Sequence, residues 1–354
     1  MKDAGYFLLM VVMFWNLENF FDPFPERNFK NGMPPDSTYF GKGDEYTPYG
    51  EKHWTRKKFS AKRDLIAKTI FAAKDEIGVL PSIIGFCEVE NRYVLNALLS
   101  ETPLAGSGYR IIHKDSPDRR GIDVALLYRE QDFKILRTKY LPERYAESFR
   151  TRQILYVKGL CRASYLGKGS DWLDTLHVFV NHWPSKVGGE KKSLPARMMI
   201  SNIVKSEVDS ILSIAPDANI ILMGDFNDTP ASKPVENLIA SELVNLVAIS
   251  TTGGTYKYKG RWEGIDQFII SKQMLADEKE ATQKDSLSPI IYKWLFCTKK
   301  SVYALKPAFL LEEDKKYLGE KIKRTFSGPR FNGGASDHLP VVLKIFSTQA
   351  IGKD

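Results

Sequence analysis

Cysteine is scarce in this chain of 354 residues, which contains only Cys87, Cys161 and Cys297. The three cysteines lie far apart in the sequence and show no Cys-x-x-Cys spacing. A disulfide framework and a cysteine-based zinc site are therefore not expected, and the cysteine usage is compatible with a reducing compartment. Internal repeats and low-complexity tracts are also absent, so no repeat architecture is indicated.

The sequence also lacks an apolar run long enough to cross a bilayer. One apolar segment, Phe7–Trp15, follows Lys2 and resembles the core of a signal peptide, but about ten residues are too few to span a membrane. No small-residue cleavage site follows it, and the run continues directly into Asn16. We interpret the segment as a buried strand and favour a cytoplasmic location, with a leader trimmed from the chain left open.

Positive charge is in modest excess over negative charge. Lysine and arginine number 51 against 43 aspartates and glutamates, which gives a net charge of +8. This excess suits an anionic substrate such as nucleic acid or a phosphorylated small molecule, although a merely basic soluble protein is equally compatible with it. Apolar residues at 43% and aromatic residues at 12% are enough for a large core, so global disorder is not expected.

Short apolar runs rich in Val, Ile, Leu and Phe predict strands that are covered on both faces. These runs are Phe7–Trp15, Ser82–Cys87, Val124–Tyr128, Leu176–Val180, Ile220–Met223, Phe268–Ile270 and Pro340–Phe346. Apolar residues at three- and four-residue steps predict two helices, one from Phe59 to Ile77 and one from Ile200 to Ile211. This mixture favours an α/β fold in which two packed sheets have helices outside them.

No linker divides the chain, so we expect residues 1–354 to form a single domain. Three stretches rich in glycine, proline or charge are expected to be surface excursions, near residues 23–54, 184–195 and 274–289. We expect a monomer and no obligate protein partner.

Polar side chains stand directly where several of the apolar runs end or begin. The residues that follow a run are Asn16, Glu88, Asn181, His182, Asp225 and Asn227, and those that precede one are Asp123, Asp266, Asp337 and His338. The end of one antiparallel strand lies beside the start of its neighbour. These side chains can therefore converge at one edge of the sheets, where they would form an acidic pocket that also contains histidines.

Such a pocket suits a hard divalent cation, because Mg²⁺ prefers carboxylate and amide oxygens. Only His182 and His338 of the five histidines stand at these positions, and no cysteine is grouped with them, so zinc is less favoured. Any one residue has an ordinary explanation: Asp225 could be a turn residue, and a single histidine is more often structural than catalytic. The prediction depends on the agreement of several positions.

Seven short motifs resemble those of the DNase I-like endonuclease/exonuclease/phosphatase superfamily, in the same order. They are FWNLEN (14–19), GFCEVE (85–90), GIDVALLY (121–128), NHWPS (181–185), GDFND (224–228), GIDQ (264–267) and SDHLP (336–340). Each motif is weak alone, but seven in order over nearly the whole chain are a strong signal. The resemblance, which is greatest to a bacterial subgroup of unassigned substrate, implies an α/β four-layer sandwich of two packed, mostly antiparallel β-sheets flanked by helices.

The resemblance implies a metal site in which Glu88 binds the principal Mg²⁺ with Asn16 beside it. Asp337 would join the metal shell or hold a second metal, and Mn²⁺ could replace Mg²⁺.

The resemblance also implies catalytic roles. Asp225 would align or deprotonate the attacking water, and Asn227 would hold the phosphate. His182 would donate to a nonbridging oxygen. His338 would act as a general base or protonate the phosphate, oriented by Asp266, and a carboxylate in that position fixes the imidazole tautomer and raises its basicity.

Substrate contacts are expected from four further residues. Asn181 and Tyr128 belong to the matching motifs, while Lys186 and Arg197 follow His182 in a basic segment that is anchored near the pocket. As an alternative, basic residues of this kind can simply form a solvated surface.

These observations lead to a first hypothesis of a Mg²⁺-dependent phosphoesterase that hydrolyses phosphodiester bonds, most simply a nuclease acting on nucleic acid. The alternative keeps the chemistry but changes the substrate to a phospholipid headgroup or a small phosphorylated metabolite. A third, less favoured hypothesis is a non-catalytic binding module that retains the fold.

Overall fold

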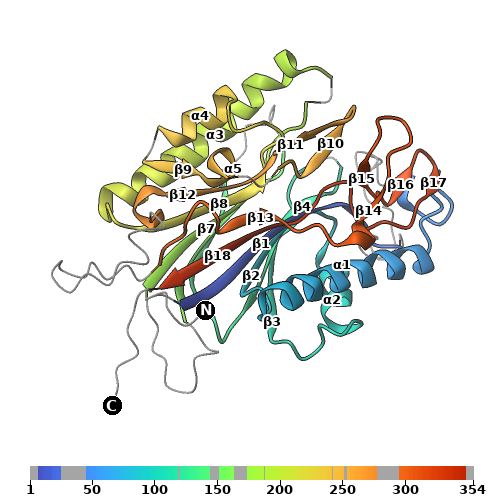
Figure 1. Cartoon of the computed structure of the whole chain (residues 1–354), viewed down its shortest axis with the longest axis horizontal. Coiled ribbons are helices and arrows are strands. Elements are labelled where there is room, and N and C mark those ends of the chain that lie inside the picture. Colours follow the sequence, from blue (N-terminus) through green and yellow to red (C-terminus); the bar gives the residue numbers. More distant parts are fainter. Residues whose placement is uncertain are drawn as a thin grey trace.

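The computed structural model describes residues 7–24, 45–118, 120–143, 151–162, 174–186, 188–240, 242–250, 253–276 and 295–347. Two six-stranded sheets pack face to face in the middle of the molecule (Figure 1). In spatial order, the first sheet consists of β13 (Val302–Ala304), β18 (Val341–Ser347), β1 (Phe7–Phe20), β2 (Ile83–Val89), β4 (Asp123–Arg129) and β3 (Tyr109–His113). The second consists of β5 (Phe133–Leu141), β6 (Ile154–Cys161), β7 (Asp174–His182), β8 (Asn219–Asp225), β12 (Asp266–Ser271) and β9 (Leu243–Asn245).

Both sheets are mixed but mostly antiparallel, as expected from the sequence. In the first, β1 pairs in parallel with β2, and in the second β7 pairs in parallel with β8. The other strand pairs of the two sheets are antiparallel.

Helices cover the two outer faces. Figure 1 shows α1 (Arg56–Ile77) and α2 (Arg92–Ser100) on one side of the sandwich, and α3 (Glu190–Ile214) and α4 (Lys233–Ile239) on the other. The short helix α5 (Leu246–Ile249) and the 3₁₀ turns η5 (Lys272–Met274) and η6 (Ala308–Leu310) lie in connections. The molecule therefore has the four layers, helix–sheet–sheet–helix, that the family resemblance implied. None of the described helices is long and apolar enough to cross a membrane.

Residue alternation along the central strands explains why one core layer forms on each face of a sheet. On β1, Val12 and Phe14 belong to the core between the sheets, while Met13 and Trp15 belong to the core under α1 and α2. On β7, Val178 and Val180 face the other sheet, whereas Phe179 lies under α3 and α4. Strands covered on both faces need apolar residues at every position, which is why their runs were recognisable.

The two predicted helices are confirmed, although α3 begins earlier than the spacing indicated. Its first residue is Glu190, so the second half of the expected excursion at 184–195 is helical, and that part of the prediction was wrong. Gly189 precedes the helix without a side-chain cap and Pro195 stands inside it, and both residues are typical of loops. At the end of the 23–54 excursion, Trp54 is fully buried and its indole N–H donates to the Phe21 carbonyl at 2.9 Å. Residues 25–44 of this excursion, and residues 277–294 of the excursion expected near 274–289, lie outside the described residues.

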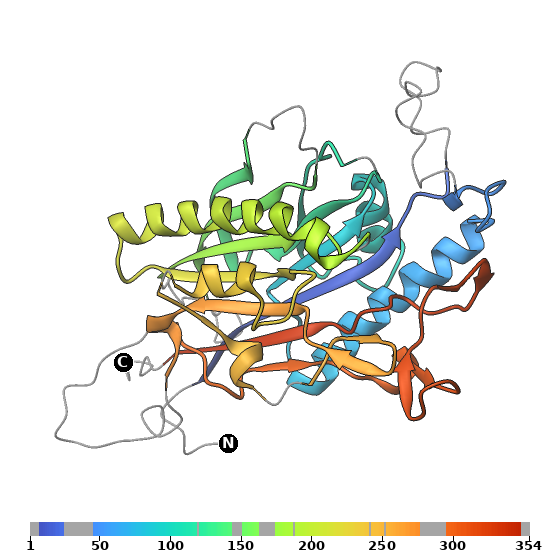
Figure 2. The same ribbon diagram turned by 90° about the horizontal axis from the view of Figure 1, so that it is seen from above.

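Three small hairpins extend one end of the sandwich. They are β10–β11 (Tyr256–Tyr258 and Arg261–Glu263), β14–β15 (Leu311–Glu313 and Glu320–Ile322) and β16–β17 (Phe326–Ser327 and Arg330–Phe331). Figures 1 and 2 show β14–β15 and β16–β17 on the side of the molecule where α1 begins, and β10 packs against β15. At the same end of the molecule β1 finishes and β18 starts, so the hairpins border the sheet edge where the polar residues were expected.

Candidate functional site

The inner faces of the two sheets change from apolar to polar at this edge. Asn16 continues the inward-facing row of Phe14 on β1, His182 continues that of Val180 on β7, and Asp225 continues that of Met223 on β8. Strand register then aligns the polar positions, because His182 pairs with Asp225 across β7 and β8, and Asp225 pairs with Asp266 across β8 and β12. The prediction that strand ends bring these groups together is therefore consistent with the register. We call Asn16, Glu88, His182, Asp225, Asp266, Asp337 and His338 the site cluster.

A histidine–carboxylate pair lies at the centre of the site cluster. His338 Nδ1 is 2.8 Å from Asp266 Oδ2, and that same oxygen accepts a 2.6 Å hydrogen bond from the Thr255 hydroxyl. The ring of His338 packs against that of Tyr256 with a centroid distance of 4.8 Å. Burial lowers the pKa of His338, but Asp266, followed by Asp337 and Asp225, outweighs it and holds the pKa well above its usual value. The neighbouring carboxylates therefore favour the protonated imidazole, and Asp266 holds the ring in one orientation.

Asp225 lies between the two histidines. Its Oδ2 is 3.9 Å from His182 Nε2 and 4.0 Å from His338 Nε2, and it accepts a 3.0 Å hydrogen bond from Asn16 Nδ2. Its other oxygen accepts from the backbone N–H of Asn227 at 2.8 Å. Burial, assisted by Asp266, raises the pKa of this carboxyl to about 7. Asp225 can therefore exchange a proton near neutral pH, which is what an acid–base group requires.

Glu88 enters the site cluster through an unusual backbone conformation. Its φ of 59° is in the left-handed region, and the β2–β4 register shifts at the same point. Its Oε2 accepts from the backbone N–H of Asn19 at 2.9 Å, whereas Oε1 receives no hydrogen bond from any described residue and lies 3.8 Å from His182 Nε2. One carboxylate oxygen of Glu88 is thus directed into the site.

Arg152 holds His182 in place, and its role was not predicted from the sequence. Arg152 Nε donates to His182 Nδ1 at 3.2 Å and its Nη2 lies 2.9 Å from Nε2, while Nη1 pairs with Asp118 at 3.1 Å. Burial, followed by the charges of Arg152 and Arg120, keeps the pKa of His182 well below its usual value, so the ring is neutral. Arg152 stands two residues before β6, a strand that the apolar runs did not predict. Had that strand been predicted, the rule of polar residues at strand starts would have found it.

A network of charges supports Asp337 and was also missed. Arg324 Nη2 lies 2.7 Å from Asp337 Oδ2, and its Nε donates to Glu18 Oε1 at 3.0 Å. The fully buried ammonium of Lys62 donates to the Glu18 carbonyl at 2.6 Å and to the Thr325 hydroxyl at 2.7 Å. Burial, then Asp337, raises the pKa of Glu18 to about 7, and burial lowers that of Lys62 to about 8. The one signal in the sequence was a lysine within the apolar stripe of the predicted first helix.

The four expected substrate contacts do not join the site cluster. Tyr128 pairs with Ile83 at the far end of β4, because the site lies where β4 begins. Asn181 is fully buried and alternates with His182, so it faces the helices, where its amide oxygen accepts from the Trp183 indole at 3.1 Å. These two contacts were wrongly predicted because strand alternation and strand direction were not applied to them.

The basic residues after His182 form a structural ion pair instead. Arg197 is fully buried, with its Nε 2.6 Å from Asp228 Oδ2, and Lys186 Nζ lies 3.0 Å from the other oxygen of Asp228. The buried guanidinium of Arg197 is not available to a phosphate, which corrects that prediction. Asn227 stays near the site, since its backbone N–H donates to Asp225 at 2.8 Å and its amide donates to the Trp183 carbonyl at 2.9 Å.

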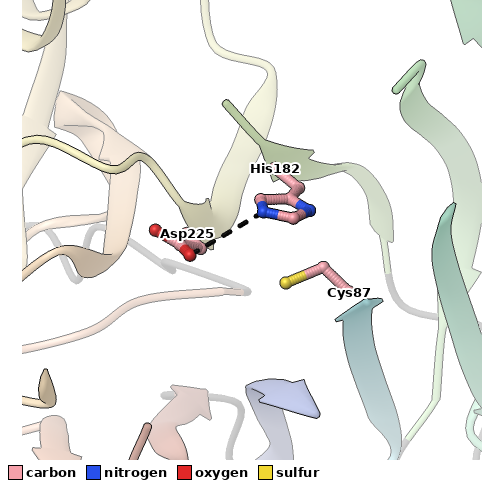
Figure 3. A group of neighbouring side chains, drawn as sticks. All are labelled: Cys87, His182 and Asp225. Atoms are coloured by element: carbon pink, nitrogen blue, oxygen red, sulfur yellow. Dashed lines mark ion pairs between the residues drawn. The ribbon is translucent and has the colours of Figure 1, made fainter. Parts of the chain in front are cut away.

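Cys87 is a further group at the site edge. It pairs with Asn16 across β1 and β2, and Figure 3 shows its sulfur pointing toward His182 and Asp225. No cysteine could be grouped with the acids from the sequence, because the register of β1 with β2 was unknown.

Comparison with solved structures shows the fold. A mannosyl-6-phosphatase of Bacteroides thetaiotaomicron is 14% identical with a TM-score of 0.53, covering 95% of this chain and 99% of its own. A functionally unknown conserved protein of Enterococcus faecalis has the same identity, TM-score and coverage. The human Nocturnin catalytic domain, solved with a bound sulfate anion, is 15% identical with a TM-score of 0.51, covering 97% of this chain and 95% of its own. At these identities the likeness concerns the fold alone.

Comparison of the sequence identifies the family. No curated protein matches the chain. A family model described as the Endonuclease/Exonuclease/phosphatase family matches residues 11–347, which is nearly the whole chain and contains the entire site cluster. The chain therefore belongs to the endonuclease/exonuclease/phosphatase family.

Proposed function

We propose that this protein is a divalent-metal-dependent hydrolase of phosphoester bonds. Its family comprises hydrolases that act on such bonds. The observation that carries the proposal is the site cluster itself. One sheet edge combines a carboxyl that titrates near neutral pH, a protonated histidine paired with Asp266, and oxygen donors directed inward. Phosphoester hydrolysis needs these three kinds of group to activate water, to stabilise developing negative charge and to hold a metal.

The donor set fits a hard cation. Glu88 Oε1 and the carboxylate of Asp337 offer oxygen. Among the described residues, the amide oxygen of Asn16 accepts only the Glu18 backbone N–H, at 2.9 Å, which leaves it one lone pair. Carboxylate and amide oxygens are the ligands that Mg²⁺ prefers, and Mn²⁺ accepts the same set. When bound, the metal would neutralise phosphate charge and polarise the phosphoryl group.

The protein's own groups would perform the proton transfers and orient the substrate. Asp225 aligns the attacking water and accepts its proton, because its oxygens are fixed by Asn16 and Asn227 and its pKa lies near 7. His338 donates from Nε2 to a phosphate oxygen, since Asp266 holds its Nδ1. Neutral His182 and the second amide hydrogen of Asn227 contribute further donors to nonbridging oxygens.

Nucleic acid or another phosphodiester is the first choice of substrate class, given the net charge of +8. A terminal phosphate on a small molecule or a lipid headgroup is the second, and one observation favours it. Asn16, His182, Asp225, Asp266 and His338 are each at most 5% exposed, so a phosphate must enter deeply to reach them. A chain end or a headgroup does this more easily than an uninterrupted polynucleotide.

One substrate panel tests both classes. The purified protein is incubated with plasmid DNA, RNA, a bis-aryl phosphodiester and a set of phosphomonoesters, with Mg²⁺, with Mn²⁺ and after chelation. The Asp225→Asn variant should lose the metal-stimulated activity by roughly a thousandfold or more. Asp209→Asn, the same change on the exposed face of α3, serves as the matched control and should leave the activity unchanged. If no substrate is hydrolysed faster with metal than without it, the proposal fails.

A further inference from the structure

Three strand ends bring a thiol, an imidazole and a carboxylate together beside the proposed catalytic groups. Cys87 comes from β2 in one sheet, and His182 and Asp225 come from β7 and β8 in the other (Figure 3). One sulfur, one ring nitrogen and one carboxylate oxygen from these residues all lie within 4.8 Å of one another. We propose that Cys87, His182 and Asp225 form a zinc site, which is separate in chemistry from the oxygen-only set of the proposed magnesium site.

The choice of ion follows from the donor atoms. Thiolate and imidazole are ligands that zinc binds strongly and that magnesium avoids. A tetrahedral zinc ion with bonds of about 2.0–2.3 Å spaces its ligand atoms roughly 3.5 Å apart. His182 Nε2 and Asp225 Oδ2 are already 3.9 Å apart, which is close to this spacing. Binding releases the Cys87 thiol proton to solvent.

Neighbouring residues supply a fourth ligand position. Glu88 Oε1 lies 3.8 Å from His182 Nε2 and can complete the tetrahedron, or a water can take that position. Zinc at Nε2 requires the ring proton on Nδ1, so Arg152 must release His182. Arg152 would keep the hydrogen bonds that its Nη1 and Nη2 already donate, to Asp118 at 3.1 Å and to the Trp183 carbonyl at 3.2 Å.

Another histidine–acid group on the described part of the molecule has a different set of donor atoms. In the group of His113, Asp115 and Asp123, the two acids lie at opposite ring nitrogens, with Nδ1 4.0 Å from Asp115 and Nε2 3.3 Å from Asp123. Asp115 is exposed and the group contains no thiol, so it does not offer the sulfur and nitrogen donors that favour zinc.

Zinc at the Cys87 site would inhibit hydrolysis, and this consequence rests on the proposed function. The ion would occupy His182 and Asp225, which hydrolysis needs free, and would draw on Glu88, which the magnesium site needs. Binding itself does not depend on any activity, so the two proposals can fail separately.

Cobalt(II) provides the direct test, because it replaces zinc and its bond to a thiolate gives a charge-transfer absorption in the near ultraviolet. The full-length protein is kept reduced with a phosphine and titrated with Co²⁺ in the presence of excess Mg²⁺. We expect the thiolate band to saturate at one equivalent and to disappear in Cys87→Ser. Competition between Zn²⁺ and Co²⁺ should show a zinc affinity at least about 100-fold lower in Cys87→Ser than in the wild type.

Cys161→Ser and Cys297→Ser are the matched controls, since both thiols are buried in the same core but away from the site. They should keep the cobalt band, and circular dichroism confirms that each variant is folded. If Cys87→Ser is unfolded, His182→Gln replaces it and should remove the tetrahedral d–d absorption. A wild-type protein without a thiolate band, or a band that survives in Cys87→Ser, would overturn the zinc site. If zinc binds but does not slow Mg²⁺-stimulated hydrolysis, only the inhibitory consequence is wrong.

Discussion

Asp266 differs from the other acids of the site in its complete burial and in the fixed partners of one oxygen. Oδ2 faces His338 Nδ1 at 2.8 Å and the Thr255 hydroxyl at 2.6 Å, and the side chain has no exposed area. A carboxylate in that place orients the imidazole and keeps it charged, but it does not itself reach the substrate. Asp266 is therefore a positioning residue in the proposed mechanism.

Asp266→Asn should lower turnover much more than substrate affinity. The amide preserves the shape but removes the charge that stabilises the protonated His338, so we expect kcat to fall by roughly a thousandfold while KM changes little. Steady-state kinetics on the best substrate of the panel measure both constants. An unchanged kcat in a folded variant would remove Asp266 from the mechanism.

Lys62 is the second residue whose burial demands an explanation. Its ammonium ties α1 to the end of β1 and to the loop before β16, through the Glu18 carbonyl and the Thr325 hydroxyl. Lys62→Met should reduce the free energy of unfolding by about 2 kcal/mol, because it leaves buried polar groups without their donor. Chemical denaturation measures the change, and Lys57→Met on the exposed side of the same helix should have almost no effect. Equal stabilities of the two variants would contradict this role.

At the residue scale, the sequence predicted the groups that directly flank apolar runs and missed those that act over distance. Asp225, Asp266 and His338 were predictable because each flanks a recognisable strand. Arg324 was not, since it reaches Asp337 and Glu18 from a hairpin region without any apolar pattern. Arg197 was misinterpreted because a local sequence cannot distinguish a basic residue at the surface from one buried against Asp228.

At the scale of elements, strands with an uninterrupted apolar run were predicted, whereas strands interrupted by charged residues, such as β5 and β6, were not. β7 and β8 alternate between two apolar cores, so their sequences are apolar throughout. The edge strand β5 has exposed positions at Lys134 and in Arg137–Thr138, so its sequence resembles that of a polar loop. Edge strands face solvent on one side, which removes the signal that the prediction uses.

The pairing of β6 with β7 contains a buried histidine that makes stability depend on pH. His177 Nδ1 lies 2.8 Å from the Tyr156 hydroxyl, and burial, followed by Lys158, lowers the pKa of the imidazole to about 4. The unfolded imidazole has a pKa near 6.5, so the unfolded state binds the proton more readily. The contribution of His177 to stability is therefore complete above pH 6.5 and is lost as the pH falls toward 4.

Comparison with His177→Gln isolates this effect. The difference in the free energy of unfolding, wild type minus variant, should decrease steadily between pH 6.5 and pH 4 and stay constant above pH 7. Urea denaturation at a series of pH values measures it, with His53→Gln at an exposed position as the control. A difference that does not change with pH would show that His177 is not held neutral by its surroundings.

At the scale of the whole molecule, function depends on how the two sheets meet. Each sheet contributes only part of the site: β1 and β2 bring Asn16, Cys87 and Glu88, while β7, β8 and β12 bring His182, Asp225 and Asp266. The residues come from positions 16 to 338, so no fragment of the chain could assemble the site alone. Overall, strand direction predicted the sheet edge, whereas the residues that fix each side chain required the three-dimensional structure.

The central claim is that this edge holds a metal and uses it to hydrolyse phosphoesters. The most direct measurement is the initial rate of hydrolysis of the best panel substrate against Mg²⁺ concentration, for the wild type, Glu88→Gln and the surface control Glu130→Gln. We predict saturable stimulation of the wild type and the control, and a rate at least about 100-fold lower in a folded Glu88→Gln. Equal rates for the wild type with Mg²⁺ and after chelation, or for the wild type and Glu88→Gln, would contradict the account.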